Sequence, residues 1–572
     1  MSEPVADLLE PFVHGPRVAY FSMEIALRAE IPTYAGGLGV LAGDTLRSAA
    51  DLELPLVGVT LVSRQGYFRQ SLDGEGRQQE APDPWDPAQW ARPLDARVAL
   101  EIGGRKVWIG GWLHVLEGHM NGRQPVILLD TDLAENTPED RCLTDFLYGG
   151  DAAYRLQQEM VLGIGGVRLL QALGFEIRHY HLNEGHSAFI ALELLRRFRY
   201  PPEDLRPGEL PYDLPRARER MSFTTHTPVE AGHDRFDYGL VQQALGEPVE
   251  PALLRRLAGS DQLNMTRLAL NMSEYVNGVA RRHAEVSRSM FPGYEVHAIT
   301  NGVHPFTWTS APFRRLYDAH IPGWCHEPEL LARVDCCIGD DAILAAHAEA
   351  KTALLDHIQA VTGRTLDPGR PLLGFARRMT AYKRPDLLFS DLGRLRAIAG
   401  RHPFQIVLAG KAHPRDEGGK QLIARIHTWA RELGEALPVV YLPDYDMAMA
   451  QALVAGVDLW VNTPLRPMEA SGTSGMKAAF NGVPSLSVLD GWWIEGCIEG
   501  VTGWAVGDSV PAASDGDAEA LYVKLDEVVL PLYHGDRSGW VAVMKGAIAK
   551  NASYFNSHRM MRRYATEAYG IR

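Results

Sequence analysis

The chain has 572 residues, of which 46% are hydrophobic and 22% charged, and this composition is typical of a soluble globular protein. One hydrophobic core cannot organise a chain of this length, so we expect two or three domains. The formal net charge of −14 does not favour a broad basic face, which argues against nucleic acid or an anionic membrane as a partner.

Cysteine usage and the N-terminal residues indicate the compartment. The five cysteines are Cys142, Cys325, Cys336, Cys337 and Cys497. An odd number, scattered except for one adjacent pair, gives neither a disulfide framework nor a CxxC zinc pattern. The first residues show no basic segment followed by an apolar run, and no apolar stretch of ~18 residues could span a bilayer. We therefore expect a reduced, cytoplasmic setting.

Strands, turns and helices alternate along the chain in two series. The first series comprises a strand at 17–25, a glycine loop at 34–39, a helix at 40–54, a strand at 55–62, a strand–turn–helix unit at 179–198, and strand ends that run into polar loops at 221–234 and 294–304. The second comprises strands at 370–379, 404–411, 439–445, 457–464 and 484–490, with helices at 385–400, 420–434 and 447–456 between them.

Buried strands that alternate with helices indicate parallel sheets covered on both faces. The sequence therefore predicts an α/β fold with two doubly wound, Rossmann-like domains that face a central cleft. The expected boundaries are an N-terminal domain at 1–305, a C-terminal domain at 306–545, and a C-terminal helix at 546–572 that packs back across the domains. A ligand should lie in the cleft, outside the carboxyl ends of the strands.

The stretch EASGTSGMKAAFNG at 469–482 places a lysine, Lys477, near the start of a helix that we expect from Met476. Free backbone N–H groups and the helix dipole make such a place suitable for an anion rather than a cation. One reading is a surface lysine that points into water. The other is a lysine whose charge is removed, for instance by an imine to a phosphate-bearing cofactor.

Two further motifs suit anions. Four cations follow the strand at 370–379, in the sequence Arg377-Arg378-Met379-Thr380-Ala381-Tyr382-Lys383-Arg384, and this cluster reads either as an oxyanion clamp or as a solvated basic turn. The loop Gly36-Gly37-Leu38-Gly39 enters a helix and offers backbone amides to a phosphate, although a tight turn explains it equally well.

The histidines His181, His186, His226 and His233 fall in strand-end loops. None forms an HExxH pair, so we expect no metal site and favour hydrogen bonding to a polar ligand such as a sugar. The pair Trp492-Trp493 reads as core rather than as a sugar-stacking wall.

Several motifs, in order along the chain, together resemble the α-glucan (glycogen, starch or maltodextrin) phosphorylase family, and in particular its short bacterial branch. They are GGLGVLAGDTLRSAADLELPLVGVTL, HLNEGHSAF, THTPVEAGHD, VNGVARRHAEV, TNGVHP, ARRMTAYKR, LAGKAHP and EASGTSGMKAAFNGVPSLSVLDG. The matches begin near Tyr20 and reach the C-terminal helix, and the EASGT…MK block is the most specific of them. The resemblance implies the GT-B type glycosyltransferase architecture for the two Rossmann-like domains.

The resemblance implies a cofactor and its site. Lys477 matches the family lysine that carries pyridoxal 5′-phosphate as an imine, with the cofactor phosphate near the amides of Thr473 and Ser474. Arg377 is expected to face that phosphate, the Gly37 amide lies close to it, and Tyr445 matches a tyrosine near the cofactor. In this family the cofactor phosphate relays a proton to the substrate orthophosphate.

The resemblance also implies the substrate-binding residues. Arg378 and Lys383, with the Gly36-Gly37 loop, match the positions that bind the substrate phosphate. Glucosyl hydroxyls are expected at Glu469, Ser471, Gly472 and Asn301. His226 matches the histidine whose backbone carbonyl lies near the developing oxocarbenium charge. Asn183 and His186 match positions that line the sugar site.

The implied reaction is reversible phosphorolysis of an α-1,4-glucan by orthophosphate, which gives glucose 1-phosphate with the α configuration retained. The catalytic set would be Lys477, Arg378, Lys383, His226 and Glu469. Two alternatives stay open: a nucleotide-sugar-dependent glucan synthase, and a catalytically inactive glucan-binding relative. The partners would be the glucan, orthophosphate and glucose 1-phosphate. Relatives are often homodimers, and the sequence identifies no pairing surface.

Three departures from the family pattern bear on specificity. About twenty residues precede the YFSMEIA strand, so we expect no allosteric control of the kind that a long N-terminal extension carries. Asp446 follows Tyr445 where animal relatives have arginine. The segment LYGGDAAYRLQQE is shorter and richer in glycine than the corresponding gate of the active site, so the preferred glucan length does not follow from the sequence.

Overall fold

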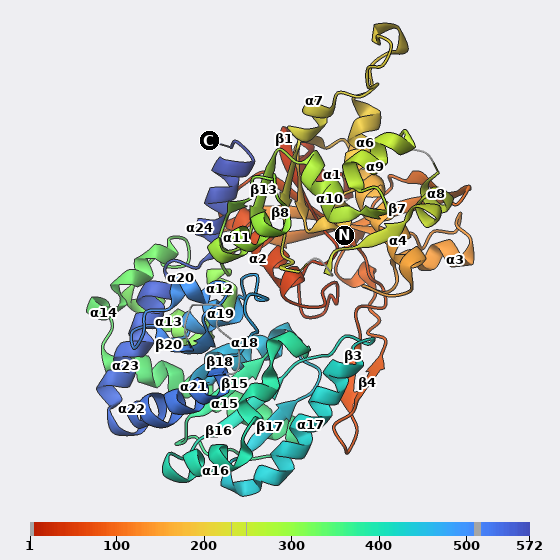
Figure 1. Cartoon of the computed structure of the whole chain (residues 1–572). Helices are drawn as coiled ribbons and strands as arrows, with labels where there is room; N and C mark the ends of the chain where they lie inside the picture. Colours follow the sequence, from red (N-terminus) through yellow and green to blue (C-terminus); the bar gives the residue numbers. More distant parts are fainter. Residues whose placement is uncertain (1–4, 230–231, 247–248, 508–515, 572) are drawn as a thin grey trace.

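The structure is a computed structural model that describes residues 5–229, 232–246, 249–507 and 516–571. Two lobes lie one above the other (Figure 1). Apart from the hairpin at 69–81, the elements up to α11 (Arg281–Met290) lie in the upper lobe. Those from α13 (Ala311–His320) onward lie in the lower lobe, except that the C-terminal end of the chain returns to the upper one.

A ten-stranded sheet forms the centre of the upper lobe within the described residues, in the order β14-β13-β10-β9-β1-β2-β8-β7-β5, with β6 paired to β7. The strands are β1 (Pro16–Ser22), β2 (Leu56–Leu61), β5 (Arg92–Pro93), β6 (Val98–Ile102), β7 (Arg105–Glu117), β8 (Arg123–Asp130), β9 (Glu176–Asn183), β10 (Met221–Thr224), β13 (Tyr275–Gly278) and β14 (His297–Ala298). Pairing from β14 to β8 is parallel, as the sequence predicts. The antiparallel pairing of β5, β6 and β7 was not predicted.

A second sheet of six parallel strands forms the centre of the lower lobe, in the order β17-β16-β15-β18-β19-β20. Its strands are β15 (Leu372–Ala376), β16 (Gln405–Ala409), β17 (Val439–Leu442), β18 (Leu459–Asn462), β19 (Ser485–Val488) and β20 (Gly503–Val506). The residues of β15, β16 and β19 are buried along their whole length because helices cover both faces of the sheet. Two sheets of this kind confirm the predicted GT-B type α/β fold, while the domain boundaries at 305 and 545 stay predictions.

Helices surround both sheets. Those of the upper lobe include α1 (Val5–Val13), α2 (Gly37–Asp51), α4 (Ala152–Met160), α5 (Gly166–Ala172), α6 (Ile190–Arg197), α8 (Tyr238–Leu245), α9 (Pro251–Ala258) and α10 (Met265–Met272). Those of the lower lobe include α15 (Asp340–Thr362), α16 (Leu392–Arg401), α17 (Glu417–Leu433), α18 (Met447–Gly456), α19 (Ser474–Ala479), α21 (Asp517–Lys524), α22 (Leu530–Gly535) and α23 (Arg537–Gly546). No helix among the described residues has both the length and the apolar character that crossing a membrane requires.

Two expected helices begin at other residues. The helix expected at 385–400 starts as a 3-10 turn at Pro385–Phe389, and α16 begins only after Asp391, whose side chain accepts a hydrogen bond from the Arg394 N–H. The helix that carries Lys477 begins at Ser474, two residues before the expected Met476. The capping hydrogen bond of Asp391 therefore sets the start of α16, whereas no side-chain cap marks the start of α19.

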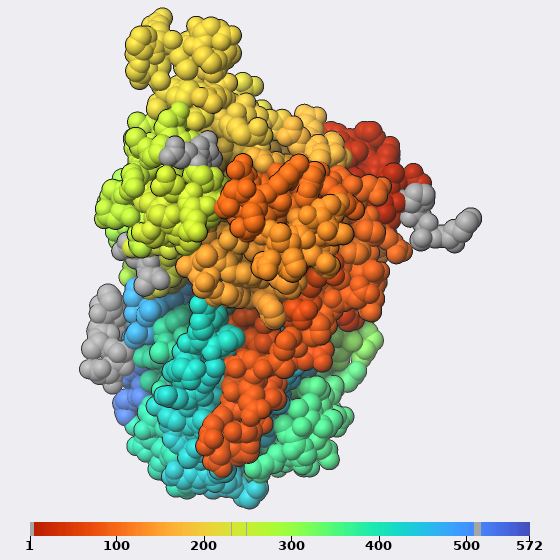
Figure 2. Space-filling model, turned by 90° about the vertical axis from the view of Figure 1, so that its right-hand side faces the viewer, coloured from red at the N-terminus to blue at the C-terminus, as the bar shows by residue number. Residues whose placement is uncertain are grey.

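Two segments connect the lobes. The hairpin of β3 (Arg69–Leu72) and β4 (Gln78–Ala81) extends from the upper lobe and lies along the lower one beside α17 (Figures 1 and 2). The C-terminal segment returns to α2 through α24 (Ser557–Arg563). We expected one helix at 546–572, but the segment is helical in pieces, because turns at 553–555 separate α24 from the helical turn at Ala547–Ala552.

Candidate functional site

Polar residues of both lobes follow the carboxyl ends of the parallel strands. In the upper lobe β1, β9 and β10 end at Ser22, Asn183 and Thr224. In the lower lobe β15 ends at Ala376 and is followed at once by the basic cluster. The two edges approach each other, since a Cβ placed on Gly36 of the upper lobe would lie 3.5 Å from Nη2 of Arg378 in the lower lobe. This is the place where a doubly wound fold binds its ligand.

Lys477 lies in the interior at this edge, and only 7% of the residue is exposed. Its Nζ is 3.9 Å from the centre of the Trp308 ring. Burial lowers the pKa of Lys477 to about 8, although the charge of Asp44 acts in the opposite direction. The first reading of the sequence, a lysine that points into water, is therefore wrong. A buried amine with a depressed pKa is a competent nucleophile toward a carbonyl group.

Three of the expected site residues form one ion cluster. Arg377 Nη2 donates to Glu469 Oε2 over 2.7 Å, and Lys383 Nζ lies 2.7 and 2.6 Å from the two Glu469 oxygens. Although burial opposes the effect, the two cations lower the pKa of Glu469 to about 2. The Nε and Nη1 atoms of Arg377 are buried without a hydrogen-bond partner. The cluster therefore holds two cations on one carboxylate and leaves donors available for an anion.

Arg378 faces the glycine loop of the upper lobe, which Glu24 organises. The Glu24 carboxylate accepts hydrogen bonds from the N–H groups of Ala35 (2.6 Å) and Gly36 (3.1 Å), and from the Tyr148 hydroxyl (2.9 Å). Among the described residues none accepts a hydrogen bond from the N–H of Gly37, the first residue of α2. An arginine and an unused helix N-terminal amide thus lie on the two sides of the gap between the lobes.

Asn183 and His226 form a contact at the ends of β9 and β10. His226 Nε2 donates to Asn183 Oδ1 over 2.6 Å, and the His226 N–H donates to Glu184 Oε2 over 2.8 Å. Burial, reinforced by His283 and His186, lowers the pKa of His226 to about 3, so the ring is neutral. The amide contact fixes the ring and thereby the position of the His226 backbone.

His186 lies close to an ion network. Its Nε2 is 3.5 Å from Asp234 Oδ2, and Asp234 in turn accepts a 3.0 Å hydrogen bond from Arg155. Burial and the charge of Arg155 lower the pKa of His186 to about 3. The His186 ring also meets the Tyr148 ring edge-on at 5.9 Å. His186 is thus connected to the glycine loop through Tyr148 and Glu24, whereas no contact joins it to the lower-lobe cluster among the described residues.

The EASGT segment bends around Glu469. Gly472 has a φ of +71°, and a Cβ on it would lie 3.4 Å from Glu469 Oε1, so a side chain here would be strained and would crowd the carboxylate. Ser471 Oγ donates to the Gly472 carbonyl over 3.0 Å. Thr473 precedes α19, and Ser474 Oγ accepts a hydrogen bond from the indole of Trp460.

Two of the expected residues remain, Asn301 and Tyr445. Asn301 Oδ1 is buried without a partner, and the Asn301 carbonyl accepts from Arg559 Nη2 of the returning C-terminal segment. Burial raises the pKa of the Tyr445 hydroxyl. The charge of Tyr34 raises this pKa further, and the charge of Arg377 lowers it. Trp492 and Trp493 are buried, which confirms that they belong to the core.

Sequence reasoning missed three residues that the structure places next to the expected ones: Trp308, Asp44 and Glu24. Trp308 covers the Lys477 amine and donates from Nε1 to Asp44 Oδ2 over 2.7 Å. Asp44 gave little signal in the sequence, because the same helix also carries Arg47 and Asp51. The position of Trp308 gave no signal, since its contact depends on two segments far apart in the sequence.

One buried cluster has the residue types of a metal site. Donor atoms of Asp51, His304 and His558 all lie within 4.8 Å of one another. The distances of 2.8 and 3.3 Å from Asp51 Oδ2 to the two imidazoles are those of hydrogen bonds, and the Thr307 N–H donates to Nδ1 of His304. His304 therefore carries its proton on Nε2 and donates it to Asp51. These contacts connect α2, the segment before α12 (Pro305–Trp308) and α24.

Comparison with known proteins shows a family match over most of the chain. A family profile described as carbohydrate phosphorylase matches residues 247–501. The maltodextrin phosphorylase of Thermococcus litoralis is 37% identical, over 96% of this chain and 70% of its own length. The glycogen phosphorylase of Aquifex aeolicus is 35% identical, over 96% and 86%. An uncharacterised protein of Methanocaldococcus jannaschii is 30% identical, over 96% and 99%.

Proposed function

The chain belongs to the carbohydrate phosphorylase family, and from this premise we propose that it catalyses the phosphorolysis of an α-1,4-glucan to glucose 1-phosphate with retention of configuration. One observation carries the proposal. The buried Lys477 amine, whose pKa is about 8, lies at the same strand-end edge as the Arg377–Glu469–Lys383 cluster. A nucleotide-sugar synthase needs no nucleophilic amine at this place.

Members of this family generally depend on pyridoxal 5′-phosphate, and the residues present fit that cofactor. Lys477 would bind it covalently through the amine, and Arg377, whose buried Nε and Nη1 have no acceptor, would bind its phosphate. The amides of Thr473, Ser474 and Gly37 would add donors, with Tyr445 beside the ring. When bound, the cofactor supplies through its phosphate a proton donor next to the substrate phosphate.

The cations of the site have a second task, the binding of orthophosphate. Arg378 and Lys383 would bind it together with the amide of Gly37. Two phosphates close together repel each other unless cations surround them, which explains why an acidic protein gathers three cations here. Glu469 contacts two of these cations in the free protein and offsets one positive charge, and its oxygens can turn to glucosyl hydroxyls once an anion replaces it.

The neutral state of His226 matters for the positive charge that develops on the glucosyl group. The transition state of glycosyl transfer carries positive charge on the sugar ring. His226 would stabilise this charge through its backbone carbonyl, and its ring adds no repulsion because it is uncharged at neutral pH. Asn183 holds the ring in place. Asn301, Ser471 and Gly472 would orient the sugar hydroxyls, and His186 would line the access to this subsite.

Glucan, orthophosphate and glucose 1-phosphate would be the reaction partners. All five cysteines are free, as expected from their pattern, and they suit the cytoplasmic location that we propose. A homodimer stays a prediction.

The experiment is to measure glucose 1-phosphate formed from a maltodextrin and orthophosphate by the purified protein and by its Lys477→Ala variant. We expect product from the wild type alone, with a loss of at least about a thousandfold in the variant. Equal rates in both proteins would contradict the role of Lys477. No product and no bound pyridoxal group in the wild type would favour a synthase or an inactive relative.

A further inference from the structure

We propose that Trp308 and Asp44 form a positioning pair that holds the Lys477 amine for covalent attachment of the cofactor. The proposal rests on the proposed function and deepens it. It concerns the protein before the cofactor binds, when the Lys477 amine must be held in position and must be able to lose its proton.

The contact geometry is the first observation. Lys477 Nζ lies over the face of the Trp308 indole, 3.9 Å from the ring centre. The indole cannot rotate freely, because its Nε1 donates to Asp44 Oδ2 over 2.7 Å. Trp308 and Asp44 are each only 1% exposed. Asp44 therefore fixes the ring, and the ring face covers the amine.

A second connection fixes the backbone of the lysine relative to the tryptophan. Asn481, which ends the helical stretch of Lys477, donates from Nδ2 to the Trp308 carbonyl (2.8 Å) and to the Lys477 carbonyl (3.2 Å). Its Oδ1 accepts from the Ser310 N–H over 2.8 Å. The fully buried Asn481 thus joins the two segments and fixes the Lys477 backbone relative to Trp308.

An aromatic face suits the attachment reaction better than a carboxylate in direct contact with the Lys477 amine would. Only the neutral amine attacks a carbonyl group, so a direct ion pair would hold the lysine as an unreactive ammonium. An indole face attracts the ammonium moderately and accepts no strong hydrogen bond from it. The charge of Asp44 raises the pKa of Lys477, but no ion pair joins the two side chains among the described residues. The pair thus orients the amine and still permits loss of its proton.

The test follows covalent attachment of pyridoxal 5′-phosphate to the full-length protein freed of cofactor, as a function of pH. Attachment is recorded by absorbance, and borohydride reduction with peptide mapping assigns it to Lys477. Each profile gives two quantities, the plateau rate at high pH, which reports position, and the midpoint, which reports the pKa of the amine. Thermal unfolding shows whether each variant is folded.

We expect Trp308→Leu to lower the plateau about tenfold, because the amine is no longer held, and to lower the midpoint by about one pH unit, because the cation loses the ring face. Trp308→Phe, which keeps a ring face but not the N–H, should have a smaller effect. Asp44→Asn should lower the midpoint, because a negative charge near the amine is lost. It should change the plateau little, because the amide oxygen still accepts the hydrogen bond from the indole. The control is Trp504→Phe, a buried tryptophan that stacks on Trp540.

Unchanged plateaus and midpoints in the Trp308 and Asp44 variants, beside normal attachment in the wild type, would overturn the inference and leave the proposed function intact. If Trp308→Leu does not fold, Trp308→Phe and Asp44→Asn decide. Absence of attachment at Lys477 in the wild type would overturn the proposed function, and this inference with it.

Discussion

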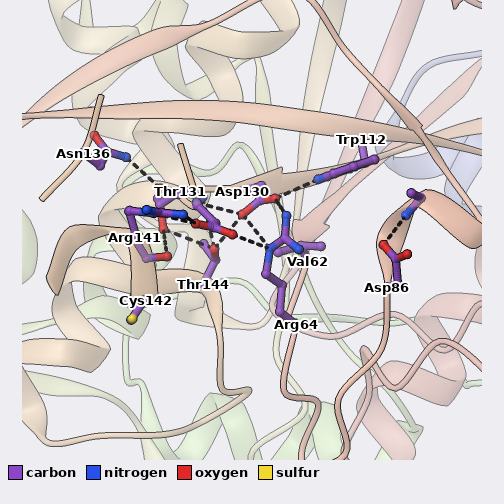
Figure 3. A network of polar contacts seen from close by, with 12 residues as sticks. Val62, Arg64, Asp86, Trp112, Asp130, Thr131, Asn136, Arg141, Cys142 and Thr144 are labelled. Carbon is purple, nitrogen blue, oxygen red and sulfur yellow. Dashed lines mark hydrogen bonds and ion pairs between the residues drawn. The ribbon is translucent and has the colours of Figure 1, made fainter. Parts of the chain in front are cut away.

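Buried charged groups lie at two strand ends of the molecule, and the two groups differ in how completely they are hydrogen-bonded. At the end of β8, Asp130 is 2% exposed and both of its oxygens are occupied (Figure 3). Arg64 Nη2 and Trp112 Nε1 donate to Oδ2 over 2.6 and 2.7 Å, and the Asp132 N–H donates to Oδ1 over 2.9 Å. Thr144 Oγ1 is 3.4 Å from Oδ1 and also accepts the Thr131 N–H. This network is complete within itself.

At the end of β15 the corresponding cluster is incomplete. Glu469 receives Arg377 and Lys383, but two buried donor atoms of Arg377 have no acceptor. Buried donors are nearly always paired in proteins, because each unpaired one costs about 1–3 kcal/mol. We infer from the difference that the Asp130 network serves the fold and that the unpaired donors of Arg377 are reserved for a ligand. The predictions below test this distinction.

Replacing the carboxylate at the incomplete cluster should have the largest effect. Glu469→Gln leaves Arg377 and Lys383 buried without a counter-charge, so we expect a loss of about 3–5 kcal/mol in the free energy of unfolding, measured in urea. Orthophosphate should restore part of it, since the anion takes the place of the carboxylate. The matched control is Glu519→Gln, which removes an exposed partner of Arg394 and should cost far less stability. Equal losses at the two positions would contradict the prediction.

Breaking the complete network should cost stability alone. Asp130→Asn removes a charged acceptor from Arg64 and Trp112, and we expect a loss of about 2–3 kcal/mol in the free energy of unfolding. Orthophosphate should not restore it. Glucose 1-phosphate formation, measured well below the unfolding temperature, should equal that of the wild type. A variant that loses activity while it keeps its stability would reverse the assignment of this network to the fold.

The fold class and the main elements could be predicted because each buried strand and each helix has its own local pattern. The expected strands at 370–379, 404–411 and 439–445 all contain the observed ones. The antiparallel part of the first sheet was missed. The 13 residues of β7 do not alternate strictly in burial, and the pairing with β8 depends on neighbours rather than on a periodic signal.

The residues that carry the chemistry of the site could be predicted from the sequence, whereas the residues that support them could not. The cations at 377–384 and Lys477 stood out as charges at strand ends. Glu24 and Trp308 act through hydrogen bonds and ring contacts that join distant segments, and such contacts leave no trace in local sequence. The structure brings Arg377, Lys383 and Glu469 together, while the roles assigned to them stay predictions.

The depressed pKa of Lys477 predicts a pH effect on the cofactor-free protein. Burial lowers this pKa from about 10.5 to about 8, so between these values the unfolded chain binds more protons than the folded one. Stability should therefore rise with pH in this window, by about 2 kcal/mol between pH 8 and pH 10 relative to Lys477→Met, which lacks the titrating group. Urea unfolding of both proteins at the two pH values measures the difference. Parallel pH dependence of the two proteins would show that the amine is not desolvated.

The smallest expected change in stability follows from replacing Arg377. Arg377→Met removes the donors that have no acceptor, and Lys383 remains to neutralise Glu469. We expect the free energy of unfolding of the cofactor-free protein to stay within about 1 kcal/mol of the wild type or to rise slightly. Affinity for pyridoxal 5′-phosphate should fall about tenfold or more, because a charged hydrogen bond to its phosphate is lost.

Fluorescence titration with the cofactor and urea unfolding of the same preparation measure both quantities. Arg64→Met at the complete network is the matched control, and it should lose stability without a change in cofactor affinity, since Asp130 would lose its charged partner. If instead Arg377→Met were as destabilising as Arg64→Met, the unpaired donors would not be a reserve for a ligand. The two strand ends would then differ only in the number of hydrogen-bond partners of each charged group.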